Sequence, residues 1–220
     1  MTFPYPHHSK GQKTTMRPTH YLPLLALFLL TLAACGDDDD STTPGGKSAA
    51  PGSLPALCTF VGEEAFAVLQ DFNFNFHPGT DPLDFSGEFL IDLMVQETSN
   101  IPGDTRDGDS FNTALFSFAD LDPATRSLTY NSVDQAASST DAYYSAAGDD
   151  FNVLVRLPSN FGGVDIVRLY AISGTLTPDG IADIQYVLYM VDDNGDPNDL
   201  LIEPGQARLL VDEDGLAVRR

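Results

Sequence analysis

The sequence predicts an all-β domain, an antiparallel meander of about eight strands that is closed as a barrel or folded as a sandwich, with room for one short helix. Three observations favour this class. Apolar and polar residues alternate through much of the chain, turn-forming residues separate the alternating stretches, and aspartate outnumbers glutamate by 26 to 6. Glutamate favours helices, whereas aspartate favours turns. With 18 Gly and 15 Pro residues, the composition disfavours a helical bundle.

Alternation with a period of two predicts the individual strands, because successive side chains of a strand point to opposite faces. The expected strands cover residues 60–76, 85–97, 111–119, 125–131, 150–157, 164–174, 181–192 and 200–212. The first of these ranges also fits two strands, or a start as a short helix over residues 63–70. Residues 133–147 are rich in Ala, Ser and Asp, which predicts either a long loop or a short helix.

Two of the expected strands, residues 164–174 and 181–192, carry apolar residues on both faces. This pattern fits central strands of a sheet, a helix packed on the sheet, or a barrel with a ligand cavity. The size of the domain is compatible with a lipocalin-like barrel. The chain has no Trp, however, and so lacks a Gly-x-Trp sequence near the first strand.

The charge of the chain excludes one class of function. The 220 residues hold 11 Lys and Arg against 32 Asp and Glu, which gives a formal charge of −21. From residue 35 onward there are eight basic residues and all of the acidic ones. Such a surface repels phosphate backbones, so we expect no binding to nucleic acid.

The N-terminal region has the features of an export signal. Residues 22–34 form an apolar run that is too short to span a bilayer, for which about 20 residues are needed, but has the length typical of a signal peptide. Arg17 and His20 lie just before it. We therefore interpret residues 1–34 as a signal peptide, and Met16 fits a true start better than Met1.

The end of this run, Leu32-Ala33-Ala34-Cys35, resembles the lipobox of bacterial lipoproteins. The resemblance covers about 20 residues and implies cleavage before Cys35 and attachment of diacylglycerol to its thiol. It also implies a membrane-bound protein of the cell envelope. The alternative is an ordinary secretory signal with a chance cysteine.

Residues 35–55 are predicted to form the lipidated cysteine and a flexible acidic tether, and residues 56–220 a single domain. The tether is polar and of low complexity, and it includes four consecutive aspartates after Gly36. In lipoproteins of diderm bacteria, Asp directly after the lipidated cysteine favours retention at the inner membrane. Gly36 occupies that position here, so the resemblance implies the outer membrane, either at its periplasmic face or at the cell surface.

The sequence offers little for catalysis. Cys58 lies in an apolar context that predicts a buried, inert thiol, and the one histidine beyond the signal region is His77. No motif for a serine nucleophile, a phosphate loop or a zinc site is present. Aspartates are so numerous that no carboxylate pair can be selected without geometry. We therefore expect no catalytic residues.

One loop resembles a calcium-binding sequence. Asp192, Asn194, Asp196 and Glu203 occupy positions 1, 3, 5 and 12 of an EF-hand-like spacing, in which oxygen ligands surround the ion. Pro197 stands where that loop needs Gly, and the flanks are predicted strands. The alternative is a hairpin turn at Asn194-Gly195. Two other acidic loops, residues 104–109 and 212–215, match less well, and no other cofactor is expected.

Together these patterns predict a lipid-anchored envelope protein that presents an acidic β-domain with a binding or structural role. Three alternatives remain at this stage. They are a carrier of a small apolar ligand, a calcium-stabilised adhesion module and a hydrolase of the envelope. The sequence does not identify the ligand or protein partner.

Overall fold

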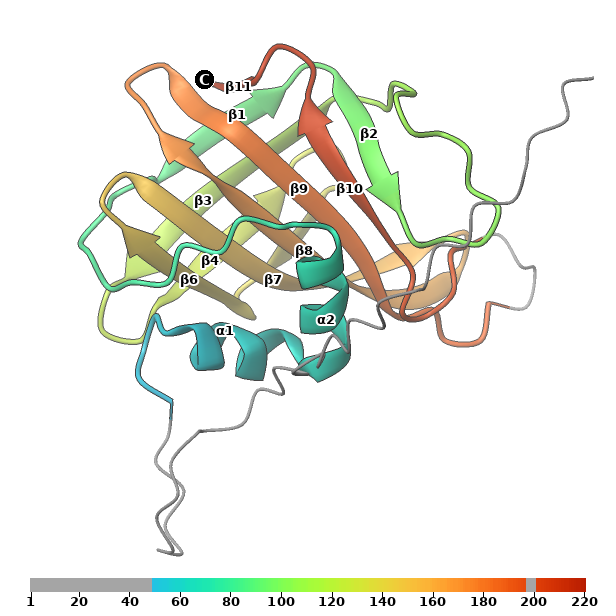
Figure 1. The fold of residues 1–220 in the computed structure, drawn as a ribbon, viewed down its shortest axis with the longest axis horizontal. Coiled ribbons are helices and arrows are strands. Elements are labelled where there is room, and N and C mark those ends of the chain that lie inside the picture. The colour runs from blue at the N-terminus through green and yellow to red at the C-terminus, as the bar shows by residue number, and fades with distance from the viewer. Residues whose placement is uncertain (1–48, 197–200) are drawn as a thin grey trace, which may run out of the picture. The chain divides into compact units, whose positions relative to one another are not determined.

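The computed structural model describes residues 49–196 and 201–220, which form two short helices and one antiparallel sheet (Figure 1). The helices are α1 (Leu54–Val61) and α2 (Glu63–Asp71). The strands are β1 (Gly87–Ile91), β2 (Met94–Ser99), β3 (Ala114–Asp122), β4 (Ser127–Ser132), β5 (Ala137–Ser139), β6 (Ala142–Ala147), β7 (Asp150–Phe161), β8 (Val164–Leu176), β9 (Gly180–Asp192), β10 (Ala207–Asp212) and β11 (Leu216–Arg219). The predicted antiparallel β class is confirmed.

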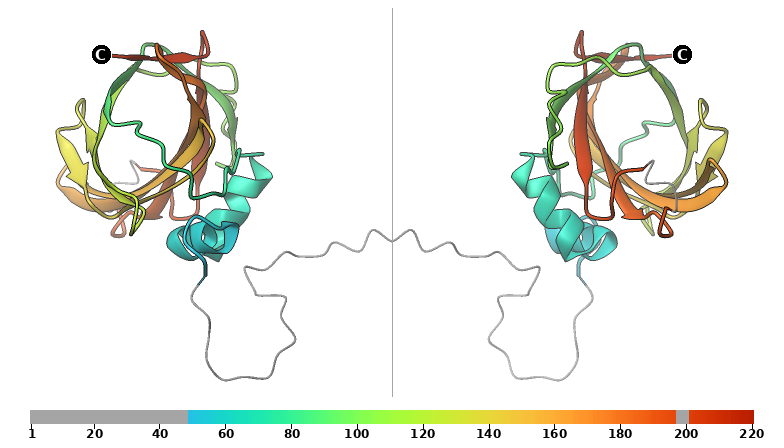
Figure 2. Two further views of the ribbon diagram at one scale, coloured as in Figure 1. Left: turned by 90° about the vertical axis from the view of Figure 1, so that its left-hand side faces the viewer. Right: turned by 90° about the vertical axis from the view of Figure 1, so that its right-hand side faces the viewer.

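The pairing of the strands closes on itself. Neighbours follow the order β1-β3-β4-β6-β7-β8-β9, and β11 pairs with both β9 and β1. Within β11, Val218 lies opposite Gly180 of β9 and opposite Leu90 of β1. We call these eight strands the β-ring, and the end-on views in Figure 2 show them around a common interior. β10 pairs with the remaining length of β9 and carries β2 on its far edge.

Aromatic side chains fill most of the interior of the β-ring. Phe85 stacks on Phe151 with ring centroids 4.4 Å apart, and Phe118 meets Phe85 edge-on at 5.3 Å. All three are almost completely buried. Burial of one such side chain contributes roughly 1.5–3 kcal/mol, so this cluster is a main source of stability.

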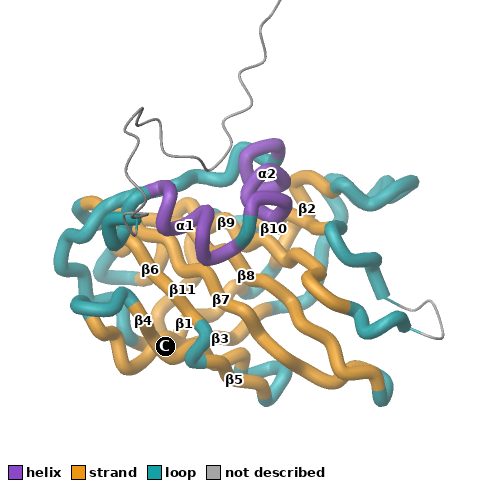
Figure 3. The backbone as a smooth tube through the Cα atoms, turned by 90° about the horizontal axis from the view of Figure 1, so that it is seen from below, coloured by secondary structure: helices purple, strands orange, loops and turns teal. Residues whose placement is uncertain are grey.

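A second apolar layer lies on the outside of the β-ring. Leu154, Leu169 and Val187 point outward from β7, β8 and β9, and they are completely or almost completely buried against the two helices. Figure 3 shows α1 and α2 lying across this face. The apolar residues on both faces of these strands are therefore explained by a helical layer packed on the sheet. None of the described helices is long and apolar enough to cross a membrane.

Residues 72–86 follow α2 and form no strand, although Thr80 makes an isolated bridge with Ala146 of β6, and residues 72–77 lie on the outer face. Side chains of three neighbouring strands bind this segment instead. Asn152 Nδ2 and Ser173 Oγ both donate to the carbonyl of Asn75, at 2.7 and 2.8 Å, and the amide of Asn75 donates to Gln185 Oε1. The amide of His77 donates to Asn152 Oδ1. We call Asn152, Ser173 and Gln185 the polar row, because they lie opposite one another in the register of β7, β8 and β9.

The N-terminal elements differ from the prediction. The strand expected over residues 60–76 is wrong, whereas the alternative of a helix starting at residue 63 is confirmed by α2. Ser53 caps α1 by accepting a hydrogen bond from the amide of Ala56, and Gly62 separates the helices with a φ of 91°. Phe72 and Phe74 are buried and Asn73 is exposed, so the alternation is real but belongs to an unpaired segment.

Two further differences concern the sheet. Residues 133–147 are expected to form a loop or a helix, but they form a turn at residues 133–136 followed by β5 and β6. The predicted strand 85–97 is divided into β1 and β2. β11 carries no alternation long enough to predict it. Its pairing depends on β1 and β9, which lie far away in sequence.

The polar row yields a test of the outer layer. In Asn152→Ala the Asn75 carbonyl loses one of its two side-chain donors and the His77 amide loses its acceptor, both at part-buried positions. We expect unfolding free energy to fall by about 2–4 kcal/mol, or the melting temperature by roughly 5–10 °C. The matched control is Asn131→Ala, which removes one bond to Ser117 Oγ. An equal effect of both variants would contradict the role given to the row.

Candidate binding cleft

One end of the β-ring is open, and a cleft of about 560 Å³ enters it there. Its walls come from β3, β4, β8, β9 and β10, with the segment before β3 and the turn after β4 at its rim. The apolar lining consists of Met94, Phe111, Ala114, Leu115, Phe116, Leu188 and Leu210. The remaining lining is polar or carries hydroxyl groups: Asn112, Thr113, Tyr130, Ser132, Asp134, Gln135, Tyr170 and Tyr186.

Three buried tyrosines line the inner part of the cleft. Tyr130, Tyr170 and Tyr186 come from β4, β8 and β9, and none is more than 5% exposed. The hydroxyls of Tyr130 and Tyr186 are hydrogen-bonded at 2.8 Å, and the ring centroids of Tyr170 and Tyr186 lie 5.3 Å apart. Burial raises the pKa of Tyr130 and of Tyr186 above its ordinary value. Burial raises the pKa of Tyr170 as well, so all three hydroxyls are neutral at the floor of the cleft.

Gln135 and Arg168 connect the cleft to its rim. The hydroxyl of Tyr170 donates to Gln135 Oε1 at 3.2 Å, and Arg168 Nη2 donates to the same oxygen at 2.6 Å. The Arg168 guanidinium lies 5.5 Å from the centroid of the Tyr170 ring. Its Nε is buried and has no hydrogen-bond partner. The turn that carries Gln135 is thus held against β8.

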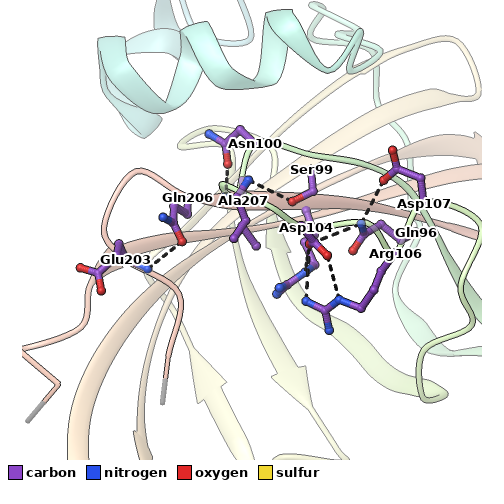
Figure 4. A network of polar contacts seen from close by, with 11 residues as sticks. Gln96, Ser99, Asn100, Asp104, Arg106, Asp107, Glu203, Gln206 and Ala207 are labelled. Carbon is purple, nitrogen blue, oxygen red and sulfur yellow. Dashed lines mark hydrogen bonds and ion pairs between the residues drawn. The ribbon is translucent and has the colours of Figure 1, made fainter. Parts of the chain in front are cut away.

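A polar network fixes the loop that forms one wall (Figure 4). Asp104 Oδ1 accepts from Arg106 Nε at 2.9 Å and Asp104 Oδ2 accepts from Arg208 Nε at 3.1 Å. Both guanidiniums face Phe111, at 5.3 and 5.9 Å from its ring centroid. The buried amide of Gln96 donates to Asp107 Oδ1 at 3.0 Å. The bond from Arg106, assisted by Ser99 and the charge of Arg208, holds the pKa of Asp104 well below its usual range.

The residues of the predicted calcium loop lie at the end of β9 and before β10. Asp192 Oδ1 accepts from the amide of Asn194, Asp196 Oδ2 accepts from the amide of Leu201, and the amide of Glu203 donates to Gln206 Oε1. Residues 197–200, which complete the loop, lie outside the described residues. Calcium binding by this loop stays a prediction.

The two cysteines and His77 were the other residues considered from sequence. Cys35 and the lipobox lie outside the described residues, so lipidation stays a prediction. Cys58 is buried in α1 as expected, but it is not a free thiol in the structure. His77 Nδ1 lies 4.0 Å from Asp150 Oδ2. The described residues therefore hold no free thiol that an imidazole could activate.

Sequence reasoning missed the cleft residues for a physical reason. Tyr130, Tyr170 and Tyr186 occupy inward positions of alternating strands, where aromatic residues are expected in a core. The usable signal was the presence of hydroxyls on these rings, because a buried hydroxyl needs a hydrogen-bond partner. Two further tyrosines, Tyr143 and Tyr144, lie in β6 and are not part of the lining of the cleft. Tyr144 is buried and the Tyr143 hydroxyl accepts from the amide of Gly52.

The arrangement of the cleft is suited to binding a small molecule. Apolar rings offer contact area, and the amides and hydroxyls at one side offer hydrogen bonds that orient a ligand. Comparisons with models of protein families, with curated proteins and with solved structures found no match.

The network at Asp104 predicts a pH dependence of stability. Because the folded pKa lies below the unfolded value of 3.8, the ion pairs stabilise the protein fully above about pH 5 and progressively less as pH falls below about 4. In Asp104→Asn, we expect the melting temperature to drop by roughly 5–10 °C at pH 7. The difference from the wild type should shrink at pH 3. The exposed Asp109 in the same loop serves as the control, and Asp109→Asn should leave the melting temperature unchanged at both pH values.

Proposed function

We propose that the protein is a lipid-anchored protein of the cell envelope whose β-domain binds a small, partly apolar ligand in the cleft. The observation that carries the binding role is the cleft itself. It brings aromatic and aliphatic side chains together with tyrosine hydroxyls and an amide on one side. Ordinary surface residues do not gather apolar side chains and hydrogen-bonding groups around one cleft.

The chemistry of the lining narrows the class of ligand. The rings of Tyr170 and Tyr186 favour a flat or aliphatic body, and Gln135 with the tyrosine hydroxyls favours a group that donates and accepts hydrogen bonds. The chain carries a formal charge of −21, and Asp134 lies in the lining. Both features disfavour an anionic ligand, so a neutral or cationic molecule fits best.

The packing of the rest of the interior argues against an enclosed carrier, in which the ligand would lie at the centre of the β-ring. Phe85, Phe89, Phe116, Phe118 and Phe151 fill the centre of the β-ring and are at most 1% exposed. The centre of the β-ring therefore has no room for a ligand, and space remains only toward its ends, in the cleft and in a second pocket of about 460 Å³ beside Leu83, Leu121 and Tyr144. We propose a site that a ligand enters from solvent and leaves without unfolding of the ring, as suits a receptor or binding module.

Filling the cleft tests the binding role. The probe is N-phenyl-1-naphthylamine, a neutral molecule whose fluorescence rises in apolar surroundings. Ala114 lines the cleft, and Ala119 is half-buried on the same strand at a position of opposite parity. We expect saturable binding of the probe by the wild type, with a Kd on the order of 10 µM. Ala114→Trp should weaken binding at least about tenfold and Ala119→Trp should not. Binding that is unsaturable, or equal in both variants, would refute the cleft as the site.

Lipid attachment is supported by Leu32-Ala33-Ala34-Cys35 and by the acidic tether that follows. We propose the outer membrane as the destination, because Gly36 rather than Asp follows Cys35. In Cys35→Ser, we expect the protein to leave the membrane fraction and to lose incorporation of labelled palmitate. Cys58→Ser is the matched control and should stay with the membrane.

The intact mass of the mature protein completes this test. Cys35 has one sulfur atom, so a thioether to lipid and a disulfide to Cys58 exclude each other. A mass that matches the polypeptide from Cys35 plus diacylglycerol supports the anchor. A mass that shows no lipid and rises by two hydrogen atoms on reduction of the disulfide would establish an ordinary exported protein instead.

A further inference from the structure

Three aspartates meet where two hairpins lie side by side. Asp92 is in the turn between β1 and β2, Asp212 ends β10, and Asp214 is in the turn between β10 and β11. Both turns lie at the same end of the sheet (Figure 1), and the amide of Glu213 donates to the carbonyl of Leu93 at 3.0 Å. Each of the three aspartates offers a carboxylate oxygen, and these oxygens lie within 4.8 Å of one another.

Asp212 is buried in this cluster without the partner that a buried carboxylate needs. It is 5% exposed, and its Oδ2 has no hydrogen-bond partner. Its Oδ1 accepts from the amide of Asp214 at 3.3 Å. An unpaired charge in such a position is costly, so buried carboxylates are paired with cations or coordinate metals.

Asp104 differs from Asp212 because it has cationic partners. Asp104 also has a nearly buried side chain, and two arginines contact its two oxygens. The ion pairs among the described residues involve Asp104 and Asp150, and none of them reaches Asp92, Asp212 or Asp214. The cluster thus lacks the compensating positive charge that this chain supplies elsewhere.

We propose that Asp92, Asp212 and Asp214 form a binding site for a divalent cation, which we assign as Ca²⁺. Calcium takes six to eight oxygen ligands at about 2.3–2.6 Å, so oxygens on opposite sides of the ion lie up to about 5 Å apart. The carboxylates of this cluster meet that spacing without movement. Asp92 and Asp214 are exposed, which leaves the outer coordination positions to water.

The site would act as a clamp on the β-ring. Met94 of β2 lies opposite Asp212 of β10, and β1 is paired with β11. An ion shared by Asp92 and the two aspartates of the other hairpin would hold these four strands together at the end where β11 closes the ring. This site is distinct from the predicted loop at Asp192 and independent of the ligand in the cleft.

Calcium titration of metal-free protein tests the proposal. By calorimetry we expect the wild type to bind with a Kd on the order of 10⁻⁴ M, as do extracellular calcium modules. About ten times that concentration of CaCl₂ should raise the melting temperature by roughly 3–6 °C over the value in EDTA. MgCl₂ at the same concentration should raise it less. An absence of any calcium effect would overturn the proposal, and an equal response to magnesium would overturn the assignment to calcium.

Variants assign the effect to the cluster. Asp212→Asn keeps the shape of the side chain. Asp214→Asn changes an exposed residue, so we expect this variant to fold as the wild type does. Both should abolish the shift and remove one bound ion. Glu213→Gln is the matched control, because Glu213 is exposed in the same turn and lies outside the cluster, and it should respond as the wild type does. If Asp192→Asn abolishes the calcium effect while Asp212→Asn and Asp214→Asn retain it, the predicted loop binds the ion and the proposal fails.

Discussion

The position of the whole N-terminal layer depends on the polar row across β7, β8 and β9. The backbone groups of Asn75 and the amide of His77 have no partner in the backbone of a strand, and burial of such groups without partners is unfavourable. Asn152, Ser173 and Gln185 supply the missing donors and acceptors from the sheet. Because the segment is held, α1 and α2 remain over the outward apolar side chains of the same strands. The central strands are thereby buried on both faces.

Burial on both faces leaves the ends of the β-ring as the places open to a ligand. The interior is filled by phenylalanines over most of its length, and at one end tyrosines replace them. The replacement adds hydroxyls that bond to one another and to Gln135. The wall beside them is fixed by Asp104 and its two arginines, which hold Phe111 in place. The proposed binding site and the stability of the domain thus depend on the same aromatic layer.

Alternation of apolar and polar residues predicts the strands whose formation depends on residues close in sequence. β7, β8 and β9 were predicted within a few residues, because each has its own alternation and its own turn. The Phe-Asn alternation of residues 72–76 predicts a strand wrongly, because the side chains that bind the backbone of this segment lie more than 70 residues away in sequence. Closure through β11, the meeting of Asp92 with Asp212, and the convergence of the tyrosines depend on long-range register. Alternation along one segment carries no information about such register.

The closing strand has a consequence for how the chain matures. β11 follows all the other described strands in sequence, and its partner β1 lies about 130 residues earlier. During synthesis, the edges of β1 and β9 that pair with β11 remain unpaired until β11 emerges. Exposed edges of this kind recruit strands from other chains, and distant pairing is slow. A holding chaperone would protect the nascent domain during that interval.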